Sequence, residues 1–412
     1  MDVTKDRSLP VRRTRSPAQA FASVRALTEA LAATLSDADA TIQSMPDASP
    51  AKWHLAHTTW FFETFVLRDH LAGYRLSHEE WPFLFNSYYE AEGPRHARPH
   101  RGMLSRPSLD EVLAYRAHVD VHLGQIMERP ELAGLIELGL NHEQQHQELL
   151  LTDIKHAFSL NPLAPAYGAF ADPAHGMAGA MEWEEHGRGC HRIGHDGAGF
   201  AFDNEGPAHD VLIGPFALAR RLVTNGEWAE FIADGGYSNA ALWLSDGWAW
   251  VNAERIAAPL YWRGGDAFTL AGMQALSPEA PVSHVSFYEA DAFATWAGHR
   301  LPTEFEWEVA AQAHDPANGN QLDEAHGAHP AGSPGLFGDC WQWTRSAYLP
   351  YPRFHPVAGA VGEYNGKFMS GQCVLKGASC ATPRGHSRAT YRNFFPPEKR
   401  WQFTGVRLAK DL

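Results

Sequence analysis

The sequence predicts two unlike halves, an all-helical N-terminal half and an α+β C-terminal half. Up to residue 158 it contains long Ala- and Leu-rich runs with few helix breakers. After Asn161-Pro162-Leu163-Ala164-Pro165, Gly and Pro become frequent and apolar runs become short. A chain of 412 residues is long enough for two domains with separate cores. We therefore expect a helical domain over residues 16–165 and an α+β domain over residues 176–412.

Four helices are expected in the first half, over residues 18–35, 51–71, 108–127 and 130–158. Ser49-Pro50 precedes the second, and Ser108 opens the third ahead of two acidic residues, as is typical of helix N-termini. One long connection, residues 72–107, joins these two helices. The pattern predicts a four-helix bundle, a fold that builds metal sites from inward side chains on facing helices.

The second half is expected to contain short strands, many turns and three clear helices. These helices cover residues 225–233, 286–297 and 303–312. The last one opens with Pro302-Thr303-Glu304, which is a good start signal for a helix. The boundary between the halves is expected at residues 165–176.

Charge and cysteine content narrow the class of protein. The chain has 34 Lys and Arg against 48 Asp and Glu, a net charge of −14, which argues against nucleic acid or an anionic membrane as the main partner. None of the four cysteines forms a CxxC pair. The charged N-terminus does not have the pattern of a secretory signal, and no apolar run is long enough to span a bilayer. We expect a reduced, cytoplasmic protein, and a monomer.

The motif His142-Glu143-Gln144-Gln145-His146 is the most informative stretch of the chain. Two histidines four positions apart lie on one face of a helix and can hold one divalent metal from the same side. Apolar neighbours such as Leu140 and Leu150 indicate that both point inward. The same motif is the zincin signature, in which Glu143 would be the general base.

A third ligand is available on the second helix, where His54 and His57 lie one turn apart. Either could complete a set of three histidines with His142 and His146, and the other would then have a structural role. Three neutral imidazoles suit Fe(II), Zn(II) or Cu(II) about equally by ligand type.

Two further segments could contribute to a site. The long connection carries Tyr88 and Tyr89 next to a cluster that includes Arg95 and Arg98; a tyrosine could donate a proton and an arginine could bind a carboxylate. Near the C-terminus, residues 391–408 contain an Asn followed by adjacent aromatics, which could cap a cationic substrate by cation–π contact. Taken alone, the loop tyrosines are better explained by packing on the bundle, and core packing of a final strand explains part of the C-terminal segment.

Taken together, six segments resemble the ergothioneine sulfoxide synthase family of non-haem iron enzymes, which includes its close relative selenoneine synthase. They are residues 55–57, 85–90, 142–146, 222–227, 301–308 and 337–344. The resemblance covers nearly the whole chain. It implies a DinB-like four-helix bundle followed by a formylglycine-generating-enzyme-like domain, which is a C-type-lectin relative.

The resemblance also implies an activity and its residues. Fe(II) would be held by His57, His142 and His146, with O2 as co-substrate. Hercynine, which is trimethyl-histidine, would be held with the help of Gln145 and Asn393, with Phe394 and Phe395 near its ring or its trimethylammonium group. The catalytic tyrosine would be Tyr88 or Tyr89, and Arg95 and Arg98 are candidates for substrate binding.

The donor of sulfur or selenium is less well defined by the resemblance. One branch of the family has an Asp where this chain has Phe395, and its absence argues for a smaller thiol such as cysteine over γ-glutamyl-cysteine. Other departures from the family pattern are Gln342, Lys376, Ala378 and the segment 369–373. Formation of a C–S bond and formation of a C–Se bond with a seleno-sugar both stay open.

Two other classes of protein compete with this interpretation. A zinc hydrolase would use Glu143 as an essential base and would need no oxygen. A non-catalytic binding module would use the lectin-like half as a scaffold and would bind no metal at His142 and His146.

Overall fold

The computed structural model describes residues 16–168, 179–197, 199–326, 328–356 and 365–412. The N-terminal segment, in which we expect no secretory signal, and most of the expected boundary at 165–176 lie outside the described residues. No helix within the described ranges is long and apolar enough to cross a membrane.

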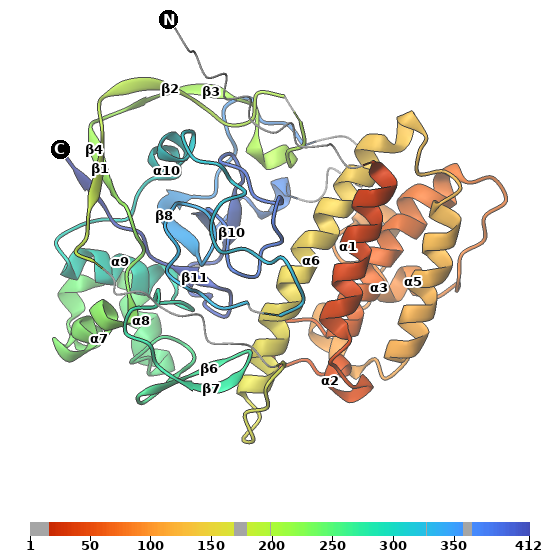
Figure 1. Cartoon of the computed structure of the whole chain (residues 1–412), viewed down its shortest axis with the longest axis horizontal. Coiled ribbons are helices and arrows are strands. Elements are labelled where there is room, and N and C mark those ends of the chain that lie inside the picture. Colours follow the sequence, from red (N-terminus) through yellow and green to blue (C-terminus); the bar gives the residue numbers. More distant parts are fainter. Residues whose placement is uncertain (1–15, 169–178, 198, 327, 357–364) are drawn as a thin grey trace, which may run out of the picture.

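The helical half contains the four expected long helices (Figure 1). They are α1 (Pro17–Ala32), α3 (Ala51–Phe62), α5 (Leu109–Leu123) and α6 (Ala133–Ser159). The second is shorter than expected because a π-helical turn, Glu63–Arg68, continues it. Two short helices, α2 (Asp37–Thr41) and α4 (Trp81–Phe85), lie in the connections. Ser108 caps α5 in a capping box, as expected, and Ser16 caps α1 in the same way. α3 begins after Pro50, as expected, without a side-chain cap.

The second half is built from small sheets and short helices, as the α+β prediction requires. β1 (Trp183–His186), β4 (Phe216–Ala219) and β12 (Ala409–Asp411) form one sheet, and β2 (Gly189–Ile193) pairs with β3 (His209–Ile213). A third sheet contains β5 (Trp262–Arg263), β6 (Asp266–Thr269) and β7 (Gly272–Ala275). The fourth has the order β10 (Asn393–Phe395), β9 (Cys373–Lys376), β8 (Trp341–Ala347) and β11 (Thr404–Gly405).

The three expected helices of this half are present as α7 (Asn225–Ala233), α9 (Phe287–Trp296) and α10 (Glu304–Ala311). The sequence analysis missed α8 (Ser245–Glu254). Its start has no side-chain cap, and it ends with Arg255 in the left-handed conformation, where a glycine would have marked the end.

The two halves share one continuous interface along α6 (Figure 1). Buried residues of the helical half form one apolar cluster with second-half side chains such as Tyr261, Leu322 and Phe403. Polar contacts cross the same boundary, including the bond from Trp341 Nε1 to Glu148 of α6. The position of α6 therefore determines how the second half sits on the bundle.

Within the bundle, α3 and α6 approach each other closely at Gly139. A Cβ at this position would lie 2.6 Å from Cε1 of Phe62 and 2.9 Å from Cε1 of Phe61. Both rings are buried, so neither can move without disturbing the core. Glycine at 139 therefore allows the two helices that carry the histidines to lie side by side.

We predict opposite effects for two glycine substitutions in α6. Gly139→Ala should lower the free energy of unfolding by about 1–3 kcal/mol, because overpacking exceeds the gain in helix propensity. Gly134→Ala, where nothing lies within 4 Å of the new Cβ, should raise it by up to about 1 kcal/mol. Urea unfolding of both variants measures the difference, and an equal response at the two positions would contradict the close approach.

Candidate active site

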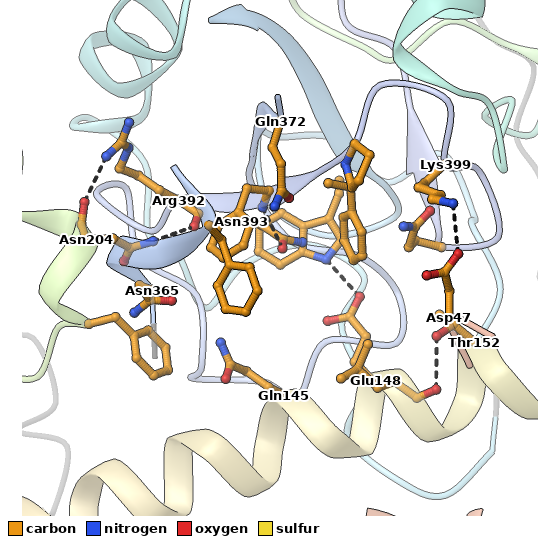
Figure 2. Close-up of a pocket in the computed structure, with 18 of the residues that line it drawn as sticks. Asp47, Gln145, Glu148, Thr152, Asn204, Asn365, Gln372, Arg392, Asn393 and Lys399 are labelled. Atoms are coloured by element: carbon orange, nitrogen blue, oxygen red, sulfur yellow. Dashed lines mark hydrogen bonds and ion pairs between the residues drawn. The ribbon is translucent and has the colours of Figure 1, made fainter. Parts of the chain in front are cut away.

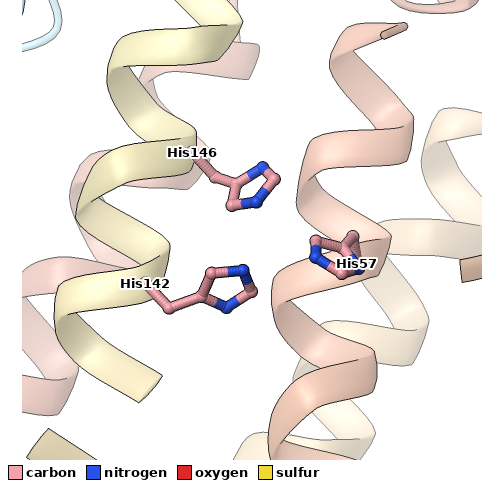
Figure 3. A group of neighbouring side chains, drawn as sticks. All are labelled: His57, His142 and His146. Atoms are coloured by element: carbon pink, nitrogen blue, oxygen red, sulfur yellow. The ribbon is translucent and has the colours of Figure 1, made fainter. Parts of the chain in front are cut away.

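Three of the expected metal ligands come together between α3 and α6. His57 of α3 faces His142 and His146 of α6 (Figure 3). One ring nitrogen from each side chain lies within 4.8 Å of the others, which is close enough for a single metal ion to contact all three. His142 and His146 share a helix face because four residues separate them.

The ring of His57 is held in one orientation. It lies between two indole rings, stacked on Trp53 at 4.6 Å and on Trp60 at 5.5 Å, with an interplanar angle of 14° in both pairs. Its Nδ1 lies 2.6 Å from the carbonyl oxygen of Phe85 and donates to it. That bond leaves the Nε2 lone pair of His57 available for a metal.

Burial keeps the three rings neutral. Burial lowers the pKa of His142 to about 4, and burial together with the neighbouring imidazoles lowers the pKa of His57 and His146 well below the usual range. Neutral imidazole is the form that binds a metal. Three closely spaced neutral nitrogen donors therefore fit a divalent transition metal such as Fe(II).

His54, the alternative ligand, occupies a different place. Its Nδ1 lies 2.8 Å from Nδ1 of His146, and its Nε2 lies 3.2 Å from Oδ2 of Asp153. Burial lowers the pKa of His54 as well. Between His54 and His57, it is therefore His57 that belongs to the cluster of three.

Glu143, the general base expected of a zinc hydrolase, is engaged elsewhere. It is fully buried, and its carboxylate accepts hydrogen bonds from Arg25 of α1, Arg116 of α5 and Thr28, at 2.8, 2.8 and 2.6 Å. Burial alone would raise the pKa of this carboxyl, but the two arginine charges outweigh it and lower the pKa to about 2. Glu143 therefore joins three helices, and its carboxylate is engaged by these three donors.

A cavity of about 300 Å³ lies between α6 and the second half (Figure 2). Six of the residues expected to bind substrate or to act in catalysis line it: Tyr88, Arg98, Gln145, Asn393, Phe394 and Phe395. These come from the long connection, from α6 and from β10. Local patterns treated the three segments separately, the family resemblance grouped Gln145 with residues 393–395, and the fold brings all six side chains to one cavity.

The wall that α6 contributes is one helix face. Gln145, Glu148, Leu149 and Thr152 line the cavity at the spacing i, i+3, i+4, i+7. Gln145 donates to the Tyr391 hydroxyl at 2.6 Å. None of the three histidines is among the residues that line the cavity; His146, which follows Gln145 in α6, has the largest exposed fraction of the three, 9%, against 1–2% for the other two.

Glu148 was missed by the sequence analysis. Its carboxylate accepts hydrogen bonds from Trp341, Ser379 and Thr382, at 2.8, 2.5 and 2.7 Å. Burial raises the pKa of this carboxyl, against the effect of the three hydrogen bonds. Its helical spacing from Gln145 was the available signal, but its partners lie more than 190 residues away in the chain.

The two candidate tyrosines differ in their surroundings. Tyr88 lines the cavity, and its hydroxyl accepts a hydrogen bond from Arg98 at 2.7 Å. Tyr89 is buried against Trp60 and Phe65 in the bundle core. Arg95 forms an ion pair with Glu90 at 2.7 Å and lines a neighbouring hollow with Tyr88 and Arg98.

The residues that depart from the family pattern differ in whether they line the cavity. Gln372 lines it. Gln342 instead points into the core of the second half, where its Oε1 accepts from Trp307 and Arg407 at 2.7 Å each. Ala378 is buried next to Ser379, which binds Glu148.

Both halves of the chain match known protein families. A model of the DinB superfamily matches residues 20–150, and a model of the Sulfatase-modifying factor enzyme 1-like domain matches residues 188–329 and 324–412. Hercynine oxygenase from Mycobacterium tuberculosis is 34% identical over 91% of this chain and 94% of its own length. Hercynine oxygenase from Mycolicibacterium thermoresistibile is 33% identical over 91% and 90%.

The chain belongs to the hercynine oxygenase family. This membership confirms the family that the sequence motifs resemble, and it confirms a DinB-like half followed by a formylglycine-generating-enzyme-like half. The second half also has relatives outside the hercynine oxygenase family. The formylglycine-generating enzyme of Thermomonospora curvata is 36% identical over 29% of this chain and 44% of its own length.

We predict that Glu143→Gln destabilises the bundle without removing the metal site. The substitution removes the buried carboxylate that both arginines share and leaves Arg25 with Asp120 and Arg116 with the more distant Glu29, so the free energy of unfolding should fall by about 3–5 kcal/mol. Metal content of the folded variant should match that of the unsubstituted protein. Calorimetry and elemental analysis measure the two quantities, and unchanged stability with lost metal would contradict the assignment.

Proposed function

We propose that this protein is an O2-dependent non-haem Fe(II) enzyme that forms a carbon–chalcogen bond at the imidazole C2 of hercynine. The observation that carries the proposal is the cluster of three neutral, buried imidazoles, two of them on α6, the helix that also forms one wall of a substrate-sized cavity. His57, His142 and His146 would hold the iron. Bound there by neutral ligands, the iron would supply open coordination positions and the capacity to activate O2.

The lining of the cavity suits hercynine. Eight of the lining side chains are aromatic: Tyr88, Phe202, Trp341, Phe368, Tyr391, Phe394, Phe395 and Trp401. Aromatic faces attract a quaternary ammonium group by cation–π interaction. Gln145 and Asn393 supply amide groups on opposite walls, which would orient the carboxylate or the imidazole.

The reaction consumes one O2 for each product. The C2–H bond of hercynine and the chalcogen–hydrogen bond of the donor break, and the new carbon–chalcogen bond forms. One oxygen atom remains on the chalcogen as the sulfoxide or selenoxide, and the other leaves as water. Tyr88 would deliver a proton within the cavity, and Arg98 orients its hydroxyl by donating to it. The aromatic walls exclude water from the reacting groups.

The residues that line the cavity favour a small chalcogen donor. They do not distinguish a sulfur donor from a selenium donor. Phe395 presents a ring packed on Trp401 where the γ-glutamyl-cysteine branch has a carboxylate. Lys399 lines the same cavity in an ion pair with Asp47 at 2.8 Å. Amides of Asn204, Asn365 and Gln372 add neutral hydrogen-bonding groups that suit the hydroxyls of a sugar as well as an amino acid. Both cysteine and a seleno-sugar are candidate donors.

An aerobic assay with Fe(II) and hercynine, read by mass spectrometry, tests the function. Cysteine, γ-glutamyl-cysteine and a seleno-sugar are offered in parallel. We expect a hercynine conjugate with cysteine or with the seleno-sugar, and no product with γ-glutamyl-cysteine. His57→Ala should abolish both iron binding and product, whereas His118→Ala, at an exposed position on α5, should change neither. Turnover without oxygen would favour a hydrolase and contradict the proposal.

We predict that the paired tyrosines respond differently to loss of the hydroxyl. Tyr88→Phe should lower product formation by about 10²-fold or more, because a proton donor is lost from the cavity. Tyr89→Phe should keep most of the turnover, since that residue lies in the bundle core. Iron content should be unchanged in both. The reverse order of the two effects would assign the donor role to Tyr89.

A further inference from the structure

A chain of hydrogen bonds runs from the cavity wall to one of the histidines. Trp401 lines the cavity, and its Nε1 donates to Oδ1 of Asp153 at 2.9 Å. Oδ2 of Asp153 lies 3.2 Å from Nε2 of His54, and Nδ1 of His54 lies 2.8 Å from Nδ1 of His146. The backbone N–H of Ser49 donates to the same Oδ2 at 2.8 Å. All of these groups are buried, so water does not compete for them.

The order of donors and acceptors between Asp153 and His146 follows from the carboxylate of Asp153. An ionised carboxylate only accepts hydrogen bonds, so the nitrogen of His54 that faces Asp153 carries the hydrogen. In the neutral ring the other nitrogen of His54 is then an acceptor. It accepts from Nδ1 of His146, which places the hydrogen of His146 on Nδ1 and the lone pair on Nε2.

We infer that Asp153 and His54 are positioning residues that hold His146 in the tautomer with a free Nε2, and that Trp401 ties this arrangement to the cavity wall. This inference rests on the proposed function, because it concerns the ligands of the same iron. It assigns a role to the histidine left over from the sequence motif. His57 is oriented in the same way through Phe85, by a carbonyl that also fixes the hydrogen on Nδ1.

Two substitutions at position 54 separate the hydrogen-bonding role of His54 from the space that its ring fills. Glutamine can offer a carbonyl oxygen to His146 and an N–H to Asp153, which is the polarity of the neutral histidine. Phenylalanine keeps the ring but offers neither. If His54 merely filled space, phenylalanine would be the better substitute; if it positions His146, glutamine is.

The test is a Co(II) titration of the metal-free full chain, followed through the visible d–d bands. His54→Phe should weaken Co(II) binding by about 10–100-fold, the usual effect of losing a partner of a metal-binding histidine. His54→Gln should retain most of the affinity and the spectrum of the unsubstituted protein. Long-range 1H–15N spectra of histidine-labelled protein should show the hydrogen of His146 on Nδ1, except in His54→Phe.

A second pair of variants keeps the test informative if His54→Phe does not fold. Trp401→Phe removes the indole N–H that reaches Asp153, so it should weaken Co(II) binding. Trp343→Phe removes a comparable buried indole bond, from Nε1 to the carbonyl of Val285 at 2.9 Å, and should leave the affinity unchanged.

The outcomes separate the two claims. Equal Co(II) affinity and spectrum in His54→Phe, His54→Gln and the unsubstituted protein would overturn the positioning role and leave the proposed function standing. A higher affinity in His54→Phe than in His54→Gln would also overturn it. Absence of Co(II) and Fe(II) binding in the unsubstituted protein would overturn the proposed function itself, and the positioning role with it.

Discussion

The rest of the structure depends on the rotational phase of α6, because three faces of this helix have three different partners. One face presents His142 and His146 to α3, and a second presents Glu143 to the arginines of α1 and α5. The third presents Gln145 and Glu148 to the second half. A helix places side chains at fixed angles, so these assignments depend on one another. Anchoring Glu143 between two arginines holds the histidines and the cavity wall in place together.

The buried histidines of α6 are neutral, whereas the buried Glu143 carboxyl on the same helix stays charged. Burial lowers the pKa of the histidines, whose neutral form binds a metal. The Glu143 carboxyl stays charged despite its burial, because Arg25 and Arg116 offset the loss of hydration. The motif thus combines neutral candidate ligands with a charged structural anchor one residue away, whereas the zincin interpretation treats the same carboxylate as a base.

Much of the fold and part of the site could be predicted from the sequence. Helical spacing and capping residues identified the four long helices, and the separation of His142 and His146 placed both on one face. Spacing could not decide between His54 and His57, since that choice depends on where Phe85 and Asp153 offer their oxygens. Local sequence patterns also could not predict which second-half residues form the cavity wall, because their contacts with α6 join segments far apart in the chain.

The measurement that tests this account most directly is an anaerobic crystal structure of the protein loaded with Fe(II) and hercynine. The account predicts one iron bound by Nε2 of His57 and Nε2 of His146, with His142 as the third ligand. Hercynine should lie in the cavity between α6 and β10, with its imidazole toward the iron and its trimethylammonium group against the aromatic wall. A metal bound by His54 or Glu143, or hercynine bound outside this cavity, would contradict it.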